Sequence, residues 1–64
     1  MDLDKAIAAV TSVRNGKKVY GFDYDAWTQA EHILRQSDKE DLAIRAHQEA
    51  IRSYRKEEWD AGLL

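Results

Sequence analysis

Apolar residues recur at intervals of three and four along most of this 64-residue chain, the spacing of a helix with one buried side. Interruptions at Asn15–Gly16 and near Ser37 divide the pattern into three segments. The sequence therefore predicts an all-α fold: one small three-helix domain covering residues 1–64. Its last two helices are expected to form an antiparallel hairpin, with a loop or short strand at residues 17–22.

The Asn15–Gly16 pair supports two interpretations. It offers the left-handed conformation that ends helices, but Asn-Gly is also the strongest short signal for a β-hairpin. A hairpin would pair "AVTSVR" with "KKVYGF" and make the fold α+β. Ala6, Ala8 and Ala9 favour a helix from Asp2 to Val13, so the helix end is the preferred interpretation.

The second helix is expected to begin at Asp23 or Asp25, both good N-caps, and to end near Gln36. Its predicted inner stripe contains Ala26, Trp27, Ala30, Ile33 and Leu34. The letters "SDKE" then fit a capping box, in which Ser37 and Glu40 would satisfy each other's backbone amides at the start of a third helix.

The third helix is expected to run roughly from Asp38 to Trp59. Its predicted inner face is rich in alanine and contains Ala43, Ile44, Ala46, His47, Ala50, Ile51 and Tyr54. Because alanine buries little area, larger side chains must complete the core. Tyr20, Phe22 and Tyr24 alternate along an extended segment, so we expect them to share a face and cover this helix.

Composition excludes several classes of protein. The chain has no cysteine, which excludes disulfides and thiolate metal sites. It opens with acidic residues and has no apolar run near the length of a membrane span, so neither a signal peptide nor a transmembrane helix is expected. A cytosolic location follows as the default. A chain this short has little core, and self-association is the stabiliser that remains.

We expect no enzymatic activity, no cofactor and no bound metal. The sequence has no glycine-rich phosphate loop and no known catalytic arrangement. Asp23 and Asp25 resemble half of a calcium loop, but the other ligands are missing and helix capping explains both residues. His47 is interpreted as a half-buried histidine hydrogen-bonded to a neighbour, and His32 as exposed.

The C-terminal residues support two interpretations: the tail folds back and covers its own core, or it forms a partner-binding surface. Trp59 and Arg55 are residue types enriched at interface hot spots, and "AGLL" ends the chain with the apolar Leu63 and Leu64. The leading hypothesis is therefore a non-enzymatic protein-binding module, a small regulator or inhibitor that occupies a surface of a larger protein. A homodimer is also expected.

The alternative is a small nucleic-acid-associated regulator that uses the basic turn Arg14, Lys17 and Lys18, with Tyr20 stacking on a base. The net charge of −2 and the mixed charges of the third helix do not favour it. The opening helix, running into "NGKKVY", resembles the start of several small bacterial and phage-encoded proteins over a few residues. The resemblance implies an accessory protein of that kind.

Overall fold

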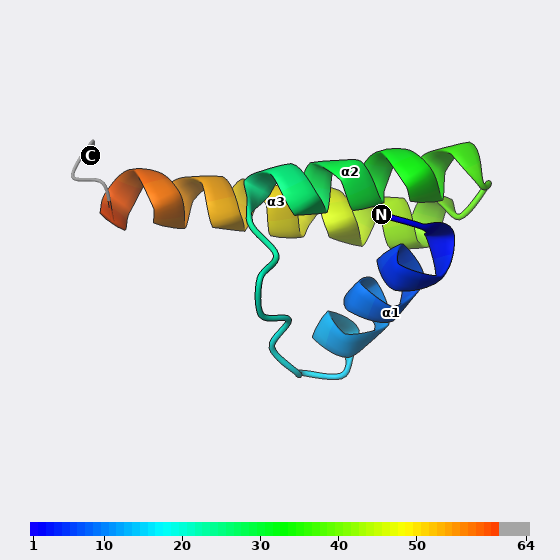
Figure 1. Ribbon diagram of the computed structural model, residues 1–64, viewed down its shortest axis with the longest axis horizontal. Coiled ribbons are helices and arrows are strands. Elements are labelled where there is room, and N and C mark those ends of the chain that lie inside the picture. Colours follow the sequence, from blue (N-terminus) through cyan, green and yellow to red (C-terminus); the bar gives the residue numbers. More distant parts are fainter. Residues whose placement is uncertain (61–64) are drawn as a thin grey trace.

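The computed structural model describes the backbone of residues 1–60 and the side chains of residues 1–57. It contains three helices: α1 (Leu3–Arg14), α2 (Tyr24–Gln36) and α3 (Glu40–Asp60). α2 and α3 lie side by side as an antiparallel hairpin, and α1 crosses against them (Figure 1). No strand occurs in this part of the chain, so the all-α prediction is confirmed and the α+β alternative is wrong.

The end of α1 explains why Asn15–Gly16 forms no hairpin. Gly16 has φ +80°, and its N–H donates to the carbonyl of Val13 at 3.0 Å. The N–H of Lys17 donates to the carbonyl of Ser12 at 2.9 Å. These two bonds form a Schellman motif, which uses the left-handed glycine to close the helix. The strand that a hairpin would need is therefore the last part of α1.

Aspartates cap the starts of both α1 and α2, and for α2 an aspartate cap was predicted. Oδ1 of Asp2 accepts a hydrogen bond from the N–H of Lys5 at 2.8 Å. Oδ1 of Asp23 accepts one from the N–H of Ala26 at 2.9 Å. Each bond satisfies a backbone donor that has no partner inside its own helix.

The predicted capping box at Ser37 is wrong, because a second Schellman motif uses these residues to end α2. Asp38 adopts the left-handed conformation at φ 58°, and the N–H of Lys39 donates to the carbonyl of Leu34 at 2.9 Å. Glu40 becomes the first residue of α3, two positions too early for its role in a capping box. The turn nevertheless separates α2 from α3, so the two do not form one continuous helix.

The core lies where the three helices meet and is built largely from alanine. Small side chains let helix axes approach closely. Trp27 and Leu34 of α2 are buried in one cluster with alanines of α1 and α3. The buried residues are Ala6, Ala9, Val10, Trp27, Ala30, Leu34, Ala43, Ala46 and Ala50. The predicted inner stripe of α2 is thus confirmed at Trp27, Ala30 and Leu34, and Ile33 is partly buried against the core.

The aromatic segment before α2 divides in a way that the sequence did not indicate. Phe22 packs edge-on against Trp27, with ring centroids 4.8 Å apart, and belongs to the core. Tyr24 instead contacts Tyr54 at 5.3 Å on the other side of α3. Tyr20 is 85% exposed, so the prediction that it covers α3 is wrong. Gly21, at φ +80°, turns the chain between Tyr20 and Phe22 and breaks their alternation.

Candidate functional site

α3 exposes four side chains that we call the apolar stripe: Ile44, His47, Ile51 and Tyr54. Ile44 is 49% exposed, Ile51 41% and Tyr54 50%, although isoleucine is among the residues most often buried. Their spacing of three, four and three places them on one side of the helix. An open groove of about 420 Å³ between α2 and α3 is lined by three of these residues, His47, Ile51 and Tyr54.

Contacts with α2 hold the stripe in place. Nδ1 of His47 lies 3.0 Å from Oε1 of Glu31, and the other carboxylate oxygen of Glu31 lies 3.2 Å from Arg35. Tyr54 packs edge-on against Tyr24. The helices are therefore joined by polar and aromatic contacts along this edge, and the aliphatic surfaces of Ile44 and Ile51 stay open to solvent.

The apolar stripe corrects the predicted inner face of α3. That face was expected to bury Ile44, His47, Ile51 and Tyr54 together with the alanines, but only Ala43, Ala46 and Ala50 are buried. The helix is rotated so that its small residues face α1 and α2. Glu49 is 9% exposed for the same reason. His47 is exposed, so the prediction that it is half-buried was wrong, but the expected hydrogen bond to a neighbour is present and joins it to Glu31.

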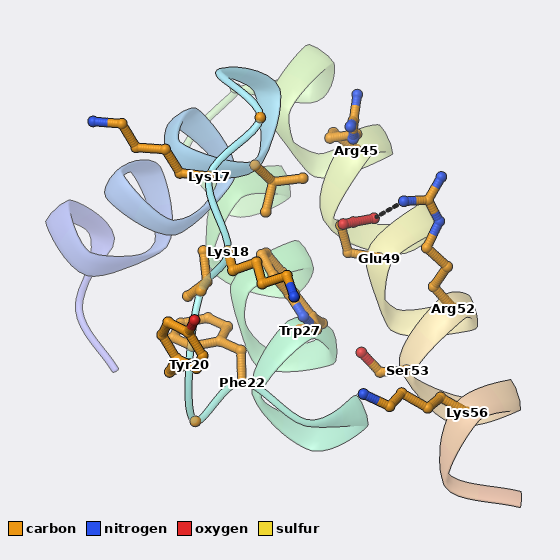
Figure 2. Close-up of a pocket in the computed structure, with 14 residues that line it drawn as sticks. Lys17, Lys18, Tyr20, Phe22, Trp27, Arg45, Glu49, Arg52, Ser53 and Lys56 are labelled. Carbon is orange, nitrogen blue, oxygen red and sulfur yellow. Dashed lines mark ion pairs between the residues drawn. The ribbon is translucent and has the colours of Figure 1, made fainter. Parts of the chain in front are cut away.

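A second surface lies on the opposite side of α3, facing the loop before α2. We call it the basic groove; it is an open depression of about 780 Å³ with Trp27 and Phe22 at its base (Figure 2). The loop supplies one side and α3 the other. Its charged side chains are Lys17, Lys18, Arg45, Glu49, Arg52 and Lys56.

The cations are arranged unevenly around this groove. Lys18 and Lys56 extend from opposite sides toward its middle, whereas Lys17 points away from it (Figure 2). Arg52 lies 3.5 Å from Oε2 of Glu49, an oxygen that is buried and has no hydrogen-bond partner. Glu49 therefore holds Arg52 at the rim, and Arg52 offsets the one carboxylate in the lining.

Three of the four residues of the predicted nucleic-acid set meet at this groove. Lys17, Lys18 and Tyr20 line it, but Arg14 does not. Sequence reasoning missed Arg45, Arg52 and Lys56, which come from α3. Their spacing of seven and four places them on one side of that helix, a pattern readable in the sequence. Nothing in the sequence indicated that the loop would lie opposite them.

The predicted partner-binding set is only partly described. Arg55 is exposed and lines the groove along the apolar stripe. Trp59 lies within α3, but its side chain falls outside the described residues, as do Leu63 and Leu64 entirely. Sequence reasoning did not single out Ile44, Ile51 and Tyr54 as a surface, because large apolar residues at helical spacing are typical of a core.

The described residues include no group of three histidine or acidic side chains placed to hold a metal ion. Asp23 caps α2, and Asp25 lies in the first turn of that helix, where a negative charge suits the helix dipole. Over the same part of the chain, no helix combines the length and the apolar character that crossing a bilayer requires.

Comparison of the chain with protein-family models, with curated proteins and with solved structures found no match. The two surfaces of α3 are therefore the features that bear on the function of the chain.

Proposed function

We propose that this protein is a non-enzymatic protein-binding module and that it binds through the apolar stripe. The supporting observation is the exposure of Ile44, Ile51 and Tyr54 on one side of α3, in a chain whose core consists mainly of alanine. Large apolar residues gathered on one exposed face are a typical mark of a protein-interaction site. A cytosolic location and a role as a small regulator belong to the same proposal.

The occupant that this geometry fits is a second copy of the chain. Intervals of three, four and three read the same in both directions, so an antiparallel copy of α3 presents an identical pattern. Ile44 of one copy then lies opposite Tyr54 of the other, and His47 lies opposite Ile51. Such self-complementarity is what a two-fold symmetric interface requires.

The charges beside the stripe fit the same antiparallel arrangement. Asp41 and Arg55 are both exposed, and each stands beside one end of the stripe on α3. Reversing one copy brings Asp41 opposite Arg55 at both ends of the interface. Continuing the pattern toward the N-terminus, the next position on this side of α3 is occupied by the charged Glu40. The apolar contact is therefore limited to four positions. We therefore expect weak association, because stable dimers usually bury about 800 Å² on each partner.

Sedimentation velocity on the full chain over a wide range of protein concentrations tests the proposal. We expect a concentration-dependent shift from monomer to dimer that Ile51→Lys abolishes. Gln29→Lys adds the same charge at an exposed position of α2, outside the groove along the stripe, and should leave the shift unchanged. A protein that stays monomeric throughout would contradict self-association.

A charge reversal tests the antiparallel orientation separately. Arg55→Asp alone should weaken the dimer, because it places two carboxylates opposite each other at both ends. Adding Asp41→Arg restores opposite charges and should restore the association. Equal dimerisation of all three proteins would argue against this arrangement of the two copies, even if the apolar stripe is the interface.

A further inference from the structure

We propose that the basic groove binds single-stranded nucleic acid, with the phosphates held by cations of the loop and α3 and a base stacked on Tyr20. This proposal does not depend on the apolar stripe, which lies on the other side of α3. The proposed surface is larger than the basic turn predicted from the sequence, because its cations come from both the loop before α2 and α3, which are far apart in the chain.

The distribution of charge is the first argument. The residues that line the groove include five cations and one carboxylate, a net charge of +4, or +3 without Lys17, whose side chain points away from the groove, whereas the whole chain carries −2. The positive charge is thus concentrated in one depression of an acidic protein. Glu49, the single carboxylate, is already paired with Arg52. Concentrated positive potential of this kind attracts a phosphate backbone and makes its binding depend on salt.

The position of Tyr20 is the second argument. Its ring is 85% exposed at the side of the groove, in a protein that needs large side chains for its core. The turn at Gly21 directs Phe22 into the core and leaves Tyr20 outside. An exposed ring beside a row of cations is the arrangement with which proteins bind single strands, since unpaired bases offer their faces for stacking.

These two features together favour a single strand over other polyanions. Bases of a duplex stack on one another inside the helix, so they offer no free face to Tyr20. An acidic peptide would use the cations but would gain nothing from base stacking. The ligand that uses both parts of the groove carries phosphates along its backbone and has unpaired bases.

The direct test measures fluorescence anisotropy of a labelled oligothymidine of about 12 nucleotides, titrated with the full-length protein. We expect binding at about 50 mM salt that falls steeply toward 200 mM. Arg45→Gln combined with Lys56→Gln removes two phosphate contacts, which should reduce the magnitude of the log–log salt slope by about 1.4. Lys5→Gln combined with Lys39→Gln removes the same charge outside the groove and should keep the slope unchanged.

Substitution of Tyr20 separates nucleic acid from a general polyanion. Tyr20→Ala should weaken oligothymidine binding about tenfold, whereas Tyr20→Phe, which keeps the ring, should preserve it. Poly-glutamate serves as the acidic-peptide probe, and we expect it to compete poorly. The proposal is overturned by absence of binding at the lower salt, or by equal losses in the groove and control variants. Equal binding of poly-glutamate with no effect of Tyr20→Ala overturns it in favour of an acidic peptide.

Discussion

The ring of Phe22 meets the ring of Trp27 edge-on, with centroids 4.8 Å apart, and this contact fastens the loop before α2 to the core. Trp27 is buried at the base of the basic groove, and Phe22 is the only large loop side chain besides Val19 that packs against the core in the described part of the chain. The position of Lys18 and Tyr20 opposite α3 therefore depends on this aromatic pair.

We predict that Phe22→Ala destabilises the protein by about 2 kcal/mol, less than a fully buried phenylalanine because the ring is only partly buried. Urea unfolding followed by circular dichroism measures the change. Tyr20→Ala is the matched control, since it removes a neighbouring ring that is 85% exposed, and should change stability by less than about 0.5 kcal/mol. Equal effects would show that the loop is not anchored through Phe22.

A second prediction concerns Asp38, the one non-glycine residue with positive φ in the described chain. The left-handed conformation costs a residue with a side chain about 1–2 kcal/mol. Glycine avoids this cost, but its larger entropy in the unfolded state offsets part of the gain in stability. Asp38→Gly should therefore raise stability by about 0.5 kcal/mol, a rise in Tm of roughly 3 °C for a domain of this size.

Gly16 provides the comparison of opposite sign, because it occupies the same position at the end of α1 with φ +80°. Gly16→Ala should lower stability by about 1 kcal/mol, although its added Cβ meets nothing within 4 Å. The two variants are compared by thermal unfolding under one set of conditions. A fall in Tm for Asp38→Gly would show that the Asp38 side chain contributes more than its conformation costs.

The features that could be predicted from the sequence are those decided by neighbouring residues. Asp23 caps α2 through an amide three positions away, and Gly16 ends α1 by its own conformation. The rotation of α3 depends instead on how closely distant helices approach. Hydrophobicity favours burying Ile44 and Ile51, but the side of α3 that is buried is the alanine side.

The basic groove could not be predicted from the sequence for a related reason. Arg45 and Arg52 share a side of α3 with Asp41 nearby, so the helix taken alone shows mixed charges. The loop contributes Lys18 and brings its charge to the same depression because Val19 and Phe22 pack against the core. The relative position of these two distant segments is set by tertiary packing, which local sequence patterns do not predict.

The third prediction tests the rotation of α3 and the position of the core. Leu34 is fully buried, so Leu34→Ala should cost about 3 kcal/mol. A domain of this size rarely has more than about 3–5 kcal/mol of stability, so this variant should lose most of its helical circular dichroism. Ile51→Ala removes a side chain that is 41% exposed and should cost less than about 1 kcal/mol. Similar losses for both would place Ile51 in the core after all.

The last prediction concerns Trp59, which the sequence singled out and whose side chain lies outside the described residues. Tryptophan is enriched at interface hot spots, and position 59 lies near the end of the helix that carries the apolar stripe. Trp59→Ala should therefore weaken self-association in sedimentation velocity and leave the helical circular dichroism largely intact. Leu34→Ala is the appropriate core reference, because Ile51 is exposed. A loss of helicity equal to that of Leu34→Ala would show that Trp59 stabilises the fold and does not bind a partner.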